Sequence, residues 1–281
     1  MNIRWIAAAA LAISPVCMLA ADGTFDKTLH VSGTPTVSVS TGSGYVRVSS
    51  GSDNEIHIVG HVHSGHGWSD WGSPEERVKE VVANPPIEQS GNTITVGKHP
   101  EYHNVSIDYD ITTPKGTSLE AHSGSGDLKV SDLGGSLRAD TGSGSIEANG
   151  LSGRVVLGTG SGDIRAQISS APDVKAETGS GSIRLQGVTG GLYAQTGSGD
   201  IEINGQPGSN WKLDTGSGTV TLNTGSSAKF SLDASTGSGT IHSDPPLTTH
   251  GSLEKHHITG DINGGGPTVR VETGSGDIRI H

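Results

Sequence analysis

The feature that most constrains the fold of this chain is a six-residue phrase, TGSGDI, which recurs with small changes along most of its length. From Ser123 the copies follow one another after 18, 18, 19, 18, 19 and 21 residues, and then after 37. The doubled last interval predicts a degenerate copy, ITGDI at residues 258–262. A period of this size is typical of a repeat protein in which each repeat is one supersecondary unit.

Each repeat contains two runs in which apolar and polar residues alternate. One run precedes the phrase, as in Leu137-Arg138-Ala139, and the other follows it, as in Ile146-Glu147-Ala148. Such alternation indicates a strand with one buried face, and stacked strands lie about 4.8 Å apart. The chain is therefore expected to be all-β: a single-stranded parallel β-solenoid (β-helix) of 18–19-residue coils. A right-handed winding is expected, although the pattern itself does not distinguish the hand.

The composition agrees with stacked small layers. Glycine supplies 44 of the 281 residues and aromatic residues only 4%, so large side chains cannot build the core. Gly-Ser-Gly is expected to turn a corner, because glycine adopts backbone angles that other residues avoid. The Thr before it is expected to end a strand, with its hydroxyl stacked on those of neighbouring coils.

The N-terminal third is less regular than the rest. Residues 1–21 read as a secretory signal peptide, with Arg4 before a short apolar run that ends in small residues. Residues 22–118 are expected to form an irregular part of the solenoid, and residues 119–281 its regular repeats. A helix is predicted over residues 73–83, because Ser73, Pro74 and Glu76 make an N-cap, a first-turn proline and a capping box.

Charge and cysteine content exclude several classes of function. The net charge of −11 argues against binding to nucleic acid, because the phosphate backbone requires basic patches. The apolar run near the N-terminus is short for a membrane span, so no membrane insertion of the mature chain is expected. Cys17, the single cysteine, lies in the expected signal peptide.

No cofactor is predicted, and the protein is expected to be exported to the periplasm, the cell surface or the medium.

Three stretches together resemble a known family: VANPPIEQSGNTITVG, DYDITTPKG and the serial TGSGDI coils. They are similar to the bacterial "putative-adhesin" family of domains of unknown function, which is related to the head domains of auto-transporter adhesins. The resemblance covers nearly the whole mature chain. It implies an exported β-helical protein and carries no catalytic residues over to this sequence.

Several side chains are candidates for binding. His57, His61 and His63 share one face of a predicted strand and are either metal ligands or part of a solvated polar face. Asp163 and Asp200 follow Gly-Ser-Gly in alternate coils, as a structural charge-spaced ladder or as a pair of acids. Trp68 and Trp71 are expected either to stack on sugar rings or to pack the helix onto the solenoid.

Together these observations predict a non-enzymatic surface-binding or structural protein, an adhesin by resemblance. The alternative is a β-helix that binds or cleaves polysaccharide, which rests on fold analogy. The expected partner is an unidentified surface, glycan or matrix component. The chain stops at TGSGDIRIH without a capping segment, so a homodimer through the C-terminal coil is one expectation and an end protected by twist and charge the other.

Overall fold

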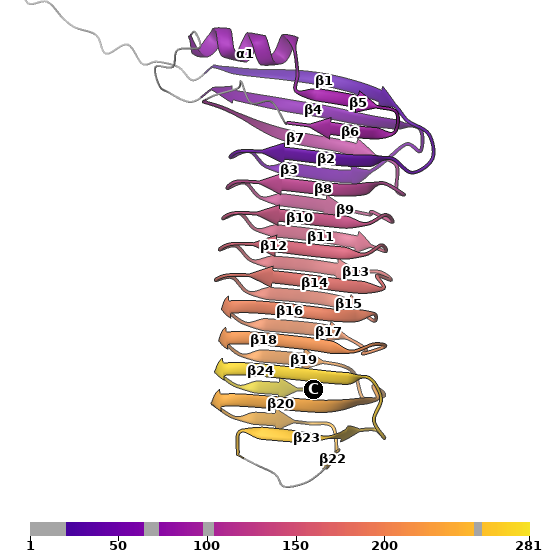
Figure 1. The fold of residues 1–281 in the computed structure, drawn as a ribbon, viewed down its shortest axis with the longest axis vertical. Coiled ribbons are helices and arrows are strands. Elements are labelled where there is room, and N and C mark those ends of the chain that lie inside the picture. The colour runs from indigo at the N-terminus through magenta and orange to yellow at the C-terminus, as the bar shows by residue number, and fades with distance from the viewer. Residues whose placement is uncertain (1–20, 65–72, 98–103, 250–254) are drawn as a thin grey trace, which may run out of the picture.

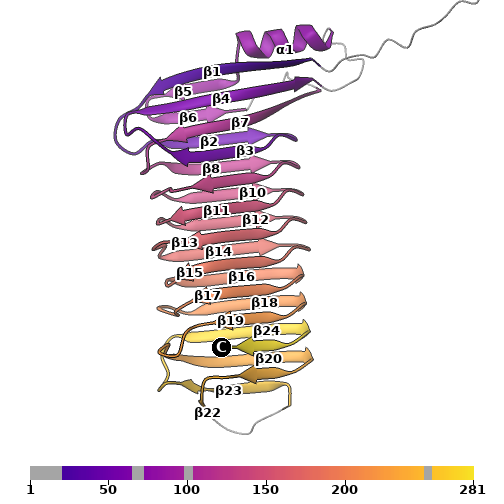
Figure 2. The ribbon, with the colours of Figure 1, turned by 180° about the vertical axis from the view of Figure 1, so that it is seen from behind.

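The computed structural model describes residues 21–64, 73–97, 104–249 and 255–281. Residues 1–20 of the expected signal peptide, and Trp68 and Trp71, lie outside the described residues. The strands form two long sheets that stack rung upon rung into a tall column, with α1 (Pro74–Ala83) at one end (Figures 1 and 2). No helix in the described part of the chain is long and apolar enough to cross a membrane.

The two sheets are named here by the order of their hydrogen-bonded strands. Sheet A runs β1 (Asp22–His30), β4 (Glu55–Ser64), β7 (Val105–Thr113), β3 (Val46–Ser50), β9 (Leu128–Ser131), β11 (Ile146–Leu151), β13 (Ile164–Ile168), β15 (Ile183–Val188), β17 (Ile201–Gly205), β19 (Val220–Asn223), β25 (Ile278–Ile280) and β21 (Ile241–Ser243). Sheet B runs β22 (Leu247–Thr249), β23 (His257–Ile262), β20 (Phe230–Ser238), β24 (Thr268–Ser275), β18 (Trp211–Ser217), β16 (Gly191–Ser198), β14 (Asp173–Thr178), β12 (Val155–Thr159), β10 (Leu137–Thr141), β8 (Ser118–Ser123), β2 (Thr36–Thr41), β6 (Thr93–Val96) and β5 (Ile87–Ser90).

The regular coils confirm the predicted β-solenoid. Each coil gives one strand to sheet B and the next to sheet A, and successive coils pair in parallel with equivalent repeat positions opposite one another. The alternating apolar residues point between the sheets and join one continuous core. One column of this core, fully buried along the stack, contains Leu128, Ile146, Ile164, Ile183, Ile201 and Val220.

The Gly-Ser-Gly corner is held by the Thr that precedes it. The hydroxyl of Thr159 donates to the carbonyl of Gly144 in the preceding coil, at 2.8 Å, and accepts the N–H of Gly162, at 3.1 Å. Thr141 and Thr178 repeat this pattern. These Thr residues stack in register from coil to coil, as expected. Each buried hydroxyl bonds to backbone groups that would otherwise be unpaired at the corner, and not to another Thr.

The N-terminal end of the column is closed by antiparallel strands and the helix. Strand β4 pairs antiparallel with β1 and β7, and β7 then runs parallel to β3 of the first coil. The helix α1 packs on β1 and β4 through Val78 and Val81, both buried. Ser73 caps it with both bonds of a capping box, as the sequence indicates.

The C-terminal end differs from expectation. After β20 and β21 the chain makes β22 and β23, which pair antiparallel, and β23 also pairs antiparallel with β20. The ITGDI segment is thus part of an antiparallel cap and not a degenerate coil. Its residues include Thr259 and Gly260, which continue the edge of sheet B beyond β20.

The final coil lies inside the stack. Strand β24 inserts between β18 and β20, and β25 between β19 and β21, parallel to both neighbours in each case. Ile278 and Ile280 are fully buried. The expectation that this coil is the open end is wrong, because the chain runs past its place and returns to fill it. Strand β25 offers no free edge for the expected homodimer through the C-terminal coil.

Candidate functional site

The outer face of sheet B carries two rows of side chains along the column. Residues two apart in a strand point to the same face, and the parallel register stacks equivalent positions from coil to coil. The first outer row contains Glu120, Arg138, Val156, Lys175, Tyr193 and Lys212. The second outer row contains His122, Asp140, Gly158, Glu177, Gln195 and Asp214.

The two rungs on either side of β12 each carry an ion pair within the strand. On β10, Nε of Arg138 lies 2.8 Å from Oδ2 of Asp140. On β14, Nζ of Lys175 lies 2.8 Å from Oε2 of Glu177. All four side chains remain between about a third and a half exposed, so each pair presents both a donor group and an acceptor group to the surface.

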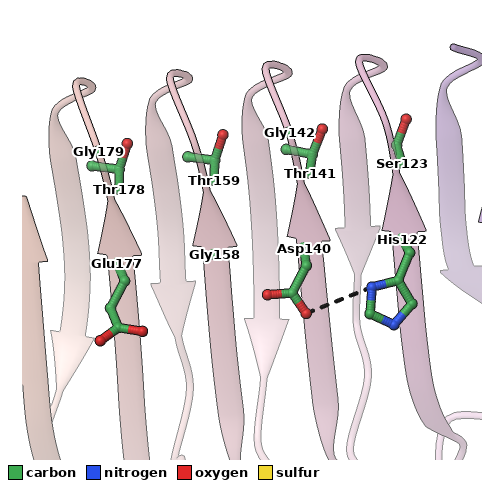
Figure 3. A pocket seen from close by; sticks show the side chains of 10 residues that line it. All are labelled: His122, Ser123, Asp140, Thr141, Gly142, Gly158, Thr159, Glu177, Thr178 and Gly179. Atoms are coloured by element: carbon green, nitrogen blue, oxygen red, sulfur yellow. Dashed lines mark ion pairs between the residues drawn. The ribbon is translucent and has the colours of Figure 1, made fainter. Parts of the chain in front are cut away.

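The rung between them, β12, has no charge in either row. It carries Val156 in the first and Gly158 in the second, so a trough opens between the two ion pairs. Figure 3 shows Asp140 and Glu177 on the strands that flank Gly158. We call this trough the β12 groove: its floor is Val156 and Gly158, and its walls are the pairs on β10 and β14.

Three hollows on this face meet at β12. The largest, about 480 Å³, surrounds Gly158 and reaches the Thr-Gly corners of the adjacent coils. The other two, about 340 and 300 Å³, both include Arg154 and Val156. The two smaller hollows thus share Arg154 and Val156, and the largest begins at Gly158, the next outward position of β12. Their other lining residues include Glu120, His122, Arg138, Asp140, Asp173, Lys175, Glu177 and Tyr193.

Asp140 is the most heavily contacted carboxylate of the groove. Besides Arg138, its Oδ2 lies 3.7 Å from Nδ1 of His122, whose Nε2 is 3.0 Å from Oε1 of Glu120. A Cβ on Gly158 would lie 2.5 Å from Oδ1 of Asp140, so this carboxylate leans over the glycine. The missing side chain at 158 thus makes room both for Asp140 and for the hollow.

Tyr193, on β16, lines the smallest of the three hollows, beyond the β14 wall of the groove. The ammonium groups of Lys175 and Lys212 lie 5.6 and 5.7 Å from the centroid of its ring, and its hydroxyl donates to the amide oxygen of Gln195. Cations at this distance attract the face of an aromatic ring. The ring is therefore held in place by its neighbours on both adjacent rungs.

Asp163 and Asp200 lie elsewhere, at the corners that lead into sheet A. Oδ1 of Asp163 accepts the backbone N–H of Ser182 in the next coil at 2.9 Å, and Oδ1 of Asp200 accepts that of Thr219 at 2.8 Å. The N–H of Ser182 lowers the pKa of Asp163, and Arg165 beside it, 2.7 Å away, lowers it further. Both acids serve as links between coils, and the structure does not bring them to the β12 groove.

The three candidate histidines lie on the outer face of β4, each beside a carboxylate of a neighbouring strand. His57 and His61 approach Asp26 and Asp110, with Nε2–Oδ distances of 2.8 and 3.4 Å. Within the described residues, no group of three His, Cys, Asp or Glu side chains is placed to hold a metal ion. A metal at His57, His61 and His63 stays a prediction without geometric support.

His63 bridges three strands of the N-terminal end. Its Nδ1 lies 2.9 Å from Oδ1 of Asp22 on β1, and its Nε2 lies 3.2 Å from Oδ2 of Asp108 on β7. The hydrogen bond to Asp22, aided by the charge of Asp108, raises the pKa of His63 despite partial burial. The cluster fastens the edge strands to one another.

Sequence reasoning missed the β12 groove. The signal was present, because Val156 and Gly158 interrupt two columns in which the flanking coils carry Arg138 with Asp140 and Lys175 with Glu177. The interruption gains meaning only once the register shows which positions share a face. Trp68 and Trp71 fall outside the described residues, so neither reading of them is tested.

The likeness to solved structures is distant. A "putative lipid binding protein" from Parabacteroides distasonis is 13% identical, with 92% of this chain and 96% of that chain covered and a TM-score of 0.49. A "putative adhesin" from Bacteroides fragilis (14%; 92% and 97%; 0.39) and a "putative cell adhesion protein" from Clostridium sporogenes (12%; 92% and 99%; 0.28) are also similar. At these TM-scores the likeness supports no argument about function. No curated protein matches the chain.

The chain can be assigned to a family of repetitive domains of unknown function. The description "Toastrack DUF4097" matches residues 79–281, from within α1 through the coils that follow β7 to the C-terminal strand. The relation to auto-transporter adhesin heads stays a prediction. Because the match spans well over half of the sequence, the chain belongs to the Toastrack DUF4097 family.

Proposed function

We propose that this protein is an exported, non-enzymatic binding module, adhesin-like in role, that holds its partner on the outer face of sheet B at the β12 groove. The observation that carries the proposal is that three hollows on this face each include residues of β12, whose two neighbouring strands each carry an ion pair. Export is supported by the character of residues 1–21, with Arg4 before a short apolar run.

The neighbours of the four carboxylates support a binding function over a catalytic one. Asp163 and Asp200 accept backbone N–H groups, and Asp140 and Glu177 are ion-paired at 2.8 Å. A general acid needs a pKa raised towards neutrality by burial or by a like charge. Each of these four side chains lies beside a hydrogen-bond donor or a cation.

Filling the groove tests this proposal. Val156→Lys with Gly158→Glu would give β12 the same kind of charged rung as β14, and the atom nearest the new Cβ is the movable end of the Asp140 side chain. We expect this variant to lose binding to immobilised glycan and matrix surfaces by at least about tenfold, which is about 1.4 kcal/mol.

The matched control is Ser38→Lys with Ser40→Glu, which places the same two charges in the same two rows on β2, outside the three hollows. It should bind as the wild type does. Equal binding by the groove-filled variant and the wild type would place the partner elsewhere on the molecule.

A polysaccharide-cleaving function is the second candidate, and one observation favours it. Asp140 and Glu177 flank Gly158 two rungs apart, which is about 9–10 Å by strand spacing. Inverting glycosidases hold two carboxyl groups about 6.5–9.5 Å apart. We expect no release of reducing ends from polysaccharides; a release that Asp140→Asn abolishes would establish the enzyme and overturn the non-enzymatic proposal.

A further inference from the structure

We propose that the partner in the β12 groove is an uncharged oligosaccharide built of pyranose rings. This inference rests on the proposed function and names the chemical class of its ligand. It follows from the shape of the groove, the charges of its walls and the strand pairing of the backbone beneath it.

The groove has the form of a short open channel along one strand. Strand β12 contributes five residues, Val155–Thr159, or about 16 Å at the strand rise. The hollows at its two ends include Gly158 on one side and Val156 on the other. An extended oligomer of a few rings fits this outline, whereas a single small molecule would contact one hollow alone.

The floor and walls differ in chemistry. Val156 offers an apolar surface at the bottom, while the ion pairs of β10 and β14 stand along both sides with donors and acceptors partly exposed. A pyranose ring has matching parts, since its C–H face is apolar and its rim carries hydroxyl groups that both donate and accept. Charged side chains make the stronger hydrogen bonds to such groups.

The charge of the groove favours an uncharged ligand. Its lining residues include three bases, Arg138, Arg154 and Lys175, and four acids, Glu120, Asp140, Asp173 and Glu177. The charges nearly cancel, so the groove has no excess of positive charge to attract an anion and little negative charge to attract a cation. Burying one member of a pair against a charged ligand would leave the other without its partner, which is costly.

A peptide strand is disfavoured by the backbone of β12. Recognition of extended peptides by strand addition requires a free sheet edge. Strand β12 pairs along its length with β10 on one side and β14 on the other. The groove therefore offers side chains alone, which suits a ligand recognised by hydroxyl groups and apolar patches.

The experiment is a titration of the mature chain, from residue 22, with defined tetrasaccharides followed by amide chemical shifts and calorimetry. The panel contains neutral hexose and N-acetylhexosamine oligomers, uronate oligomers and a neutral peptide of similar length. We expect saturable binding of at least one neutral oligomer, with shifts on β10, β12 and β14. Raising NaCl from about 0.05 to about 0.5 M should change its affinity less than about twofold, since no net charge is neutralised.

The variants complete the test. Val156→Lys with Gly158→Glu should weaken the neutral oligomer at least about tenfold, and Ser38→Lys with Ser40→Glu should leave it unchanged. Binding of uronate oligomers in place of every neutral oligomer would overturn the uncharged class of ligand, and binding of the peptide alone would overturn the sugar; in both cases the groove itself survives. Neutral oligomers bound equally by all variants would overturn the groove as their site. No binding by any oligomer, together with groove-dependent attachment to surfaces, would reject the sugar and keep the proposed function.

Discussion

Asp163 shows how one side chain ties a coil to the next. Its carboxylate accepts the N–H of Ser182, and Asp127 and Asp277 make the same bond to Ser145 and Thr240 at 2.8 and 3.0 Å. A second carboxylate on the receiving rung would repel the first at one strand spacing. The alternation of Asp with Ser or Thr therefore follows from a donor–acceptor relation between adjacent coils.

Asp163 also yields a pH-dependent prediction. Its pKa is lowered in the folded state, so its contribution to the free energy of unfolding is present above its unfolded pKa, near 3.8, and is lost as pH falls through the lower folded value. Because the side chain is 36% exposed, we expect Asp163→Asn to cost about 0.5 kcal/mol at pH 7. The cost should vanish near pH 2.

Urea unfolding at both pH values measures this difference. Glu88→Gln on the exposed β5 is the control for loss of a carboxylate and should show no cost at either pH. A cost for Asp163→Asn that is the same at both would mean that the charge of the carboxylate is not what stabilises the corner.

At this scale, part of the site could be predicted from the sequence. The alternation of Asp163 and Ser182 was read as charge spacing, but the backbone N–H that explains it has no side-chain signature. Val156 and Gly158 were unremarkable as single letters. Their importance depends on Arg138 and Lys175 lying on either side, which only the register between coils brings together.

Among the structural elements, the Gly-Ser-Gly corner sets how closely coils can stack. A Cβ on Gly160 would lie 2.3 Å from the carbonyl oxygen of Gly142, and one on Gly162 would lie 1.9 Å from that of Gly144. These oxygens belong to the backbone and cannot turn aside. Glycine is required here by the neighbouring coil, since neither Gly160 nor Gly162 has a positive φ.

Gly42 provides a matched comparison for this idea. It holds the same place in the first copy of the phrase as Gly160 does in a central one, yet nothing lies within 4 Å of a Cβ built on it. We expect Gly160→Ala to lower the free energy of unfolding by about 2–3 kcal/mol through overpacking, and Gly42→Ala to be close to neutral. Thermal and urea unfolding measure both variants, and equal effects would show that turn conformation, not coil contact, requires the glycine.

The elements that could be predicted are those with local signals. The repeated coils follow from period-two alternation, and α1 from the capping box at Ser73 and Glu76. Strand β4 was expected as a strand, but its antiparallel place between β1 and β7 depends on pairing across long sequence separations. The antiparallel pairing of residues 258–262 was missed because their sequence, ITGDI, is similar to the repeat.

For the whole molecule, the chain order and the spatial order agree only in the middle of the column. At the N-terminal end the strands directly beside the coil of β2 and β3 are β6 and β7, which follow it in sequence. At the C-terminal end the coil of β24 and β25 is covered by strands that precede it. Both ends thus close by strands that run past and return. A repeat protein needs such ends, because an uncovered coil exposes apolar groups and unpaired strand edges.

The role of the inserted coil, β24 and β25, can be tested by deletion. Deleting residues 268–281 removes β24 and β25, which separate β18 from β20 and β19 from β21. We expect amides of β20 to lose most of their protection from hydrogen exchange, because Phe230–Ser238 would keep β23 as its sole partner strand. Protection in β8 to β15 should persist, since nearest-neighbour coils carry most of the stability of a solenoid.

Mass spectrometry of exchanging peptides reads each region separately. Arg279→Gln is the control, since it changes an exposed side chain of the same coil and keeps the core residues Ile278 and Ile280. If β20 stays protected after the deletion, the coil of β24 and β25 is dispensable and the interleaved order is not what holds this end. If β20 opens while β8 to β15 stay closed, the last residues of the chain act as an internal rung, and the cap of β22 and β23 depends on them for its place.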